Sequence, residues 1–172
     1  MTDGVEFPED PGAFAAGRPE VAAPDADPVY AVGIGPGNPE YLTRRGARAV
    51  READVVVGFE TVVEFVESEI TGDALTCGYD DEPEVLAEFA DRVAGGERGT
   101  AVLMGDPNHS GYQFVGKVES AVDTPVEVIP GISSLQIAAS RARTPMEETT
   151  FVTLHKSGPI EADLERLDRD VG

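Results

Sequence analysis

The sequence predicts an α/β fold in which helices cover a parallel β-sheet. Short apolar runs rich in β-branched residues, such as VYAVGIG at 29–35 and DVVVGF at 54–59, are typical of strands buried on both faces. Amphipathic segments of helical length lie between these runs. Because parallel strands need long crossover connections, this alternation favours a parallel sheet with helices on its faces.

The expected elements alternate along the chain. Strands are expected at 29–35, 54–59, 73–78, 100–105, 125–130 and 149–155. Helices are expected at 43–53, 61–69, 83–94, 111–122 and 132–142, with a last surface helix at 160–172. In the third helix, Pro83 suits the first turn, and Gly95 and Gly96 end the apolar periodicity.

The chain is expected to have three parts. Residues 1–27 are acidic, contain several prolines and show no apolar periodicity, so they are predicted to be a disordered tail. Residues 28–121 are predicted to form an N-terminal αβα domain, and residues 122–172 to begin a second one. One strand at 149–155 and one helix after it are a poor ending for a second sheet. The second domain is then either small or, as we expect, incomplete.

Composition excludes several classes of function. Thirteen basic and 33 acidic residues give a net charge of −20, which argues against binding to nucleic acids or anionic membranes. No apolar run is long enough to span a bilayer, and the acidic N-terminal segment lacks the features of a secretory signal. The single cysteine, Cys77, allows no internal disulfide and is expected to be an inert core thiol. A cytoplasmic location is therefore predicted.

The basic residues are almost all arginines. Only Lys117 and Lys156 are lysines. Acid excess with scarce lysine resembles the proteins of salt-loving archaea, because at molar salt the screening length falls to about 3 Å and like charges repel little. A mesophilic acidic protein is the alternative.

The first strand leads into GIGPGNPEYLT at 33–43, which resembles a nucleotide-binding loop. A dinucleotide fingerprint requires a third glycine where Asn38 stands. Pro36 and Pro39 each remove a backbone N–H that a pyrophosphate cradle would use. Glu60, after the second strand, is placed to contact a ribose. An NAD-binding oxidoreductase therefore stays open, as does a tight turn without a ligand.

Two further strand ends carry polar loops. In LMGDPNHSGYQF at 103–114, Asp106 is suited either to bind a ribose or an amine or to cap the following helix. His109 in this loop is either a ligand contact or simply solvated. In PGISS at 130–134, either Ser133 or Ser134 can cap the next helix, which leaves the other hydroxyl free for a ligand.

Taken together, GIGPGNPEYLT, GDP at 105–107 and PGISS resemble the tetrapyrrole methylases, the S-adenosylmethionine-dependent enzymes of sirohaem and cobalamin synthesis. The stretches VGIGPGNPEYLT, ADVVVGFE, PGISSLQIAASR and FVTLHKSG are most similar to the cobalt-precorrin-7 carbon-5 methyltransferase (precorrin-6Y methylase) group. The resemblance covers residues 29 to about 158.

The resemblance implies two αβα domains with S-adenosylmethionine in the cleft between them. It places seven residues at the methyl donor: Pro36, Met104, Gly105, Asp106, His109, Ser133 and Ser134. It implies no metal and no catalytic dyad, because the sulfonium already activates the methyl group. Further donor contacts of the family are expected beyond Gly172. The implied substrate is a cobalt-precorrin, and the implied assembly is a homodimer.

The substrate carboxylates need basic partners on a very acidic protein. Gly35 and Gly37 are expected near the substrate, and Arg44 or Arg45 is expected to bind a carboxylate, with an ordinary surface arginine as the alternative. Other functions stay open: a tetrapyrrole methylase acting on another carbon, a diphthine synthase relative, an NAD-dependent oxidoreductase, or an inactive fragment.

Overall fold

The computed structural model describes residues 27–154 and 159–171. The chain divides into two compact units, Met1–Ser134 and Leu135–Gly172, which are described separately. Apart from Asp27, the predicted tail lies outside the described residues.

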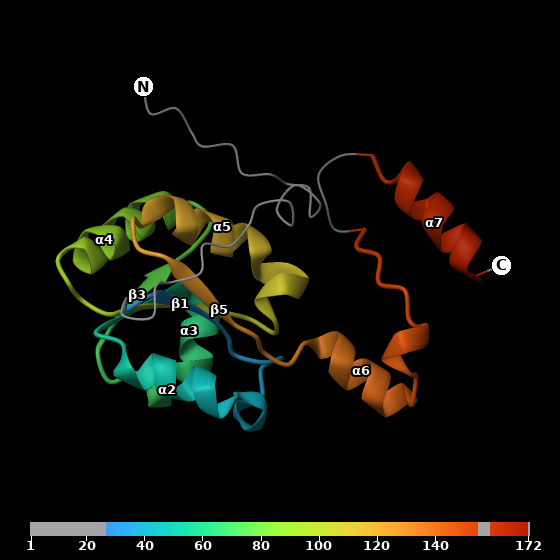
Figure 1. Cartoon of the computed structure of the whole chain (residues 1–172), viewed down its shortest axis with the longest axis horizontal. Helices are drawn as coiled ribbons and strands as arrows, with labels where there is room; N and C mark the ends of the chain where they lie inside the picture. Colours follow the sequence, from blue (N-terminus) through green and yellow to red (C-terminus); the bar gives the residue numbers. More distant parts are fainter. Residues whose placement is uncertain (1–26, 155–158, 172) are drawn as a thin grey trace. The chain divides into compact units, whose positions relative to one another are not determined.

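The first unit is built on a five-stranded, wholly parallel sheet with strand order β3-β2-β4-β1-β5 (Figure 1). Its strands are β1 (Val29–Gly33), β2 (Val55–Phe59), β3 (Asp73–Cys77), β4 (Gly99–Leu103) and β5 (Val126–Ile129). The three strands β4, β1 and β5 are therefore neighbours. Since all strands run in the same direction, their carboxyl ends lie along one edge of the sheet.

Helices cover both faces of this sheet. One face packs against α2 (Arg44–Glu52) and α3 (Glu60–Val66), and the other against α4 (Glu82–Ala94) and α5 (Tyr112–Ala121). Strand residues alternate between the two cores: Val55 and Val57 face α4 and α5, and Val56 faces α2 and α3. This arrangement confirms the predicted α/β fold.

Local sequence signals explain several element ends. The Thr43 hydroxyl accepts a hydrogen bond from the Gly46 N–H at 3.0 Å and so caps α2. Helix α3 ends in a short 3₁₀ turn, η2 (Glu67–Glu69), and a π-turn, η3 (Pro107–Gly111), precedes α5. A further 3₁₀ turn, η1 (Pro39–Tyr41), follows the first loop.

The domain boundary differs from the prediction. Strand β5 pairs in parallel with β1, so it completes the first sheet instead of opening a second one. The first unit accordingly runs to Ser134 and does not end at residue 121. Hydrophobic pattern alone could not assign β5 to a sheet, because a buried strand reads the same in either one.

The second unit contains α6 (Ser134–Ala142, which begins at the boundary), the 3₁₀ turn η4 (Met146–Glu148) and α7 (Glu161–Val171). The strand predicted at 149–155 is wrong for residues 149–154, which form neither strand nor helix. A strand needs a hydrogen-bonded neighbour, and the described part of this unit offers only helices and turns. The start of a second, incomplete αβα domain stays a prediction.

Candidate functional site

The loops after β1, β4 and β5 meet at the carboxyl edge of the sheet. Gly35 and Gly105 form an antiparallel bridge, in which the Gly35 N–H donates to the Gly105 carbonyl at 3.2 Å and the Gly105 N–H to the Gly35 carbonyl at 2.7 Å. Both residues have positive φ, 86° and 68°, a backbone conformation that glycine adopts at little cost. The bridge fixes the first two loops to each other.

Glycines also let the third loop approach. A Cβ atom on Gly131 would lie 2.1 Å from the Gly105 carbonyl oxygen, and one on Gly33 would lie 2.6 Å from the same oxygen. Both distances are far below van der Waals contact, so no larger residue fits without moving the backbone. We call the meeting point of Gly33, Gly35, Gly105 and Gly131 the glycine junction.

Asp106 ties the junction together. One carboxylate oxygen accepts the Gly131 N–H at 3.1 Å, and the other accepts the Asn108 N–H at 2.9 Å. The Asp106 carbonyl also accepts the His109 N–H at 3.0 Å. Asp106 therefore caps its own turn and links the β4 loop to the β5 loop. The predicted contact of Asp106 with a methyl donor stays a prediction.

The other predicted donor residues lie in the same three loops. Pro36 is half-buried directly after the bridge, and Met104 is half-buried against the core on the α2 and α3 side. Ser133 is buried with its Cα 3.9 Å from where a Cβ on Gly105 would lie. His109 and Ser134 are exposed. The structure thus brings Pro36, Asp106 and Ser133 to one edge of the sheet.

The predicted substrate residues are placed as follows. Gly37 has φ 94°, and a Cβ there would lie 3.4 Å from the Phe65 ring, which is 44% exposed. Arg44 is exposed at the start of α2. Arg45 is already paired with Glu127 of β5. This pair joins residues that are far apart in the sequence, so no local motif could predict it.

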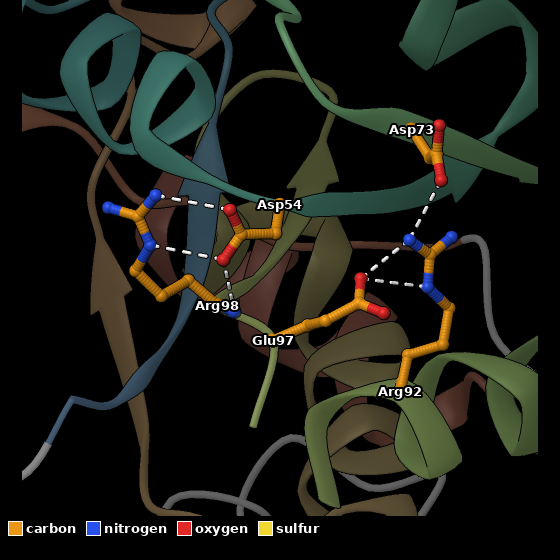
Figure 2. A network of polar contacts seen from close by, with 5 residues as sticks. All are labelled: Asp54, Asp73, Arg92, Glu97 and Arg98. Carbon is orange, nitrogen blue, oxygen red and sulfur yellow. Dashed lines mark hydrogen bonds and ion pairs between the residues drawn. The ribbon is translucent and has the colours of Figure 1, made fainter. Parts of the chain in front are cut away.

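The opposite, amino-terminal edge of the sheet is held by ion pairs (Figure 2). Arg98 contacts Asp54 through Nε and Nη2, both at 3.1 Å, and Arg92 bridges Asp73 and Glu97. The hydrogen bonds from Arg98 hold the pKa of Asp54 below its ordinary value. These charged groups are satisfied by one another, at the edge remote from the glycine junction.

A comparison with sequence families identifies the family of the chain. A sequence model of the tetrapyrrole (corrin/porphyrin) methylases matches residues 28–171. The chain belongs to this family. Solved structures of similar proteins superpose on this methylase-family chain with TM-scores between 0.51 and 0.63, in agreement with its α/β fold.

The relatives that resemble this methylase-family chain are named for different reactions of the family. A protein of Methanocaldococcus jannaschii named "Probable cobalt-precorrin-7 C(5)-methyltransferase" is 36% identical over 129 residues, which cover 74% of this chain and 60% of that protein. A siroheme synthase of Chromobacterium violaceum is 31% identical over 190 residues, which cover 98% of this chain and 40% of the relative. The chain therefore spans 40% to 60% of the lengths of these two relatives.

One solved structure of a similar protein holds a ligand. It is the uroporphyrin-III C-methyltransferase of Thermus thermophilus complexed with S-adenosylhomocysteine. It is 32% identical, has a TM-score of 0.52, and is matched over 65% of this chain and 48% of its own.

Other chemistries find little support among the described residues of the methylase-family chain. Within 27–154 and 159–171, no three His, Cys, Asp or Glu side chains gather as metal ligands. Nor is any helix in those ranges long and apolar enough to cross a membrane. Cys77 is buried, and burial together with the nearby Glu82 raises its thiol pKa to about 11, which disfavours the nucleophilic thiolate.

Proposed function

We propose that this chain belongs to an S-adenosylmethionine-dependent C-methyltransferase that methylates a tetrapyrrole of the cobalamin or sirohaem pathways. We further propose cobalt-precorrin-7 as its substrate, with carbon 5 as the methylated position. The observation that carries the proposal is the glycine junction, where three loops of a tetrapyrrole methylase meet at one sheet edge. The relative named for the cobalt-precorrin-7 C(5) reaction supports the finer assignment.

The junction suits a donor that must approach the backbone closely. The Cβ positions of Gly35 and Gly131 are filled by Tyr41 and by the Gly105 carbonyl oxygen, whereas that of Gly105 has only the Ser133 Cα within 4 Å. We propose that a flat adenosyl group lies against the main chain at Gly105. We propose that the donor is held by Pro36, Met104, Gly105, Asp106, His109, Ser133 and Ser134. The Asp106 carboxylate is the one formal negative charge among these residues, and it favours a cationic sulfonium.

The protein's task in this reaction is positioning. Bound S-adenosylmethionine supplies a methyl group that its sulfonium already activates. Gly35 and Gly37, together with the half-buried Pro36, would border the path by which the acceptor carbon approaches. Holding two reactants in line can supply several kcal/mol of the barrier reduction, so no catalytic dyad is required.

The geometry disfavours the NAD-binding alternative. A dinucleotide loop must point its N–H groups at a pyrophosphate, but the Gly35 N–H is used by the Gly105 carbonyl. Pro36 and Pro39 contribute no N–H at all. Two helical N–H groups after the loop are also engaged: the Glu40 N–H donates to the Asn38 side chain and the Gly46 N–H to the Thr43 hydroxyl.

A thermal-shift experiment at high salt tests the donor. We expect S-adenosylhomocysteine to raise the melting temperature, since a ligand that binds only the folded state stabilises it, and NAD to leave it unchanged. Stabilisation by NAD alone would favour an oxidoreductase. Stabilisation by neither would favour an inactive fragment.

An assay with S-adenosylmethionine and cobalt-precorrin-7 tests the substrate. We expect methyl transfer to carbon 5, read by NMR of the product. Methylation at another carbon, or of a different tetrapyrrole only, would assign the chain to another branch of the family; methylation of a protein substrate would point to a diphthine synthase relative. We also propose a homodimer and a cytoplasmic location, of which the first is testable by sedimentation.

A further inference from the structure

A depression of about 280 Å³ lies between α2 and the two strands β1 and β5. Its lining residues come from these three elements: Tyr30, Arg45, Arg48, Ala49, Glu52 and Ile129. Ala49 and Ile129 are buried beneath it, and its accessible lining is mostly polar. The charged residues lie on one stripe of α2, because positions three or four apart share a helix face.

The two arginines of the depression differ in their contacts. Arg45 forms an ion pair with Glu127, which neutralises its charge. Arg48, one turn further along, is exposed and makes no ion pair or hydrogen bond with any other described residue. A guanidinium offers a planar fork of donors that matches a carboxylate. Arg48 is therefore the arginine that is free to receive an anion.

The surroundings make this cation unusual. The nine residues of α2 hold four arginines, Arg44, Arg45, Arg48 and Arg51, out of thirteen basic residues in a chain of net charge −20. The cationic helix therefore concentrates nearly a third of the basic charge. Two of the four arginines are paired, Arg45 with Glu127 and Arg51 with Glu69, so the unpaired positive charge of α2 comes from Arg44 and Arg48.

The depression adjoins the glycine junction. Ile129 is the last residue of β5, and Gly131 of the junction follows two positions later. Tyr30 is the second residue of β1 and Glu52 is the last of α2, so the depression extends from Ile129 toward the amino-terminal edge of the sheet. A macrocycle held over the junction can extend one peripheral carboxylate arm past Ile129 at the end of β5, with its carboxylate at Arg48.

We infer that Arg48 anchors one carboxylate arm of the tetrapyrrole, with Tyr30 and Ile129 in contact with the stem of that arm. The inference rests on the proposed function and places this carboxylate contact at Arg48 instead of the paired Arg45. Arg48 is a positioning residue for the acceptor and does not touch the methyl donor.

Binding of uroporphyrin, a stable tetrapyrrole polycarboxylate, tests the inference without turnover. Its dissociation constant is followed by the change in its visible absorption, and that of S-adenosylhomocysteine is measured separately by calorimetry. We expect R48A to weaken uroporphyrin binding about tenfold, which corresponds to about 1.4 kcal/mol. R48K should keep part of the affinity, because lysine retains the charge but not the fork.

R51A is the matched control. It removes the same charge from the same helix, but Arg51 pairs with Glu69 outside the depression. We expect R51A to change uroporphyrin binding less than twofold, and both variants to bind S-adenosylhomocysteine like the parent protein. Circular dichroism confirms that each variant is folded.

The outcomes separate the two proposals. Equal weakening by R48A and R51A, or none by either, overturns the role of Arg48, and so does a parent protein that binds S-adenosylhomocysteine but not uroporphyrin. The role is also overturned if R48A changes the mass measured by sedimentation but leaves uroporphyrin binding unchanged. That result would indicate that Arg48 contacts a second copy of the chain. Arg48-dependent uroporphyrin binding without any S-adenosylhomocysteine binding would support the anchor while contradicting the proposed donor.

Discussion

The two edges of the sheet are held together by different means. At the amino-terminal edge, charged side chains pair across loops: Asp54 with Arg98, and Arg92 with Asp73 and Glu97 (Figure 2). At the carboxyl edge, the main chains of three loops are in direct contact at the glycine junction. The Asp106 carboxylate accepts the Gly131 N–H and so links the β4 loop to the β5 loop.

This difference indicates which contacts can accommodate an amino-acid substitution. At the amino-terminal edge, Arg98 and Asp54 are both exposed and can rearrange, and exposed pairs contribute little to stability, whereas Arg92 is only 23% exposed. The glycine contacts leave no room, because a methyl group would overlap a carbonyl oxygen. The amino-terminal edge has a crowded glycine as well, because a Cβ on Gly72 would lie 2.3 Å from the Asp54 carbonyl oxygen, so the contrast concerns the ion pairs and not every contact there. We propose that the carboxyl edge serves the ligand.

The largest effect is expected from Gly131→Ala. Its Cβ would lie 2.1 Å from the Gly105 oxygen, so the junction must open, at a cost of about 3 kcal/mol of unfolding free energy. Loss of S-adenosylhomocysteine binding should accompany this destabilisation. Urea unfolding and calorimetric titration measure the two effects.

Gly96→Ala is the matched control at the opposite edge. Gly96 has φ 96° but nothing within 4 Å of its Cβ position, so only the backbone conformation is penalised, by about 1 kcal/mol. S-adenosylhomocysteine binding should be unchanged. Equal destabilisation by the two substitutions would contradict the contrast between the edges.

An intermediate effect is expected from Asp106→Ala. The change removes the acceptor of two backbone N–H groups, those of Gly131 and Asn108, at a cost of about 2 kcal/mol. We expect weaker S-adenosylhomocysteine binding, since the β4 and β5 loops are no longer tied. Asp106→Asn retains one acceptor oxygen, so its stability and its S-adenosylhomocysteine affinity should lie between those of Asp106→Ala and of the parent protein. If neither substitution changes the affinity for S-adenosylhomocysteine, Asp106 does not contribute to the donor site.

The smallest effect is expected from Asp54→Asn, and it should depend on pH. Arg98 lowers the pKa of Asp54 in the folded state, so the pair stabilises the protein above the ordinary pKa of 3.8. That contribution is lost as the pH falls through the lower folded pKa. The parent protein should exceed the variant in stability at neutral pH, and the difference should vanish in acid.

Unfolding curves at several pH values and at low and high salt check this prediction. Molar salt should reduce the difference, because it screens exposed charges. S-adenosylhomocysteine binding should not change, since Asp54 lies at the other edge. A difference that grows as the pH falls would contradict the sign of the linkage.

Much of the fold was predictable because it depends on local pattern. The buried strand runs of β1 and β2 and the capped start of α2 at Thr43 are written in consecutive residues. The strand predicted at 149–155 failed for residues 149–154, because an apolar, β-branched run becomes a strand only beside a partner. Strand β5 was assigned to the wrong domain for the same reason.

The site was only partly predictable. The residues of its three loops could be named from GIGPG, GDP and PGISS, since turn glycines and prolines mark strand ends. Two contacts join residues that are far apart in the sequence: the hydrogen bond from the Gly131 N–H to Asp106, and the ion pair between Arg45 and Glu127. No local spacing encodes such contacts.

The order of residues alone determined that this chain alternates buried strands with amphipathic helices, and that glycine and proline close its key turns, because hydrophobic period and backbone freedom are local properties. Tertiary structure decided that β4, β1 and β5 lie side by side, so that three separate turns share one edge. Strand order is a matter of long-range packing, and only that packing settles that Arg45, and not Arg48, pairs with Glu127.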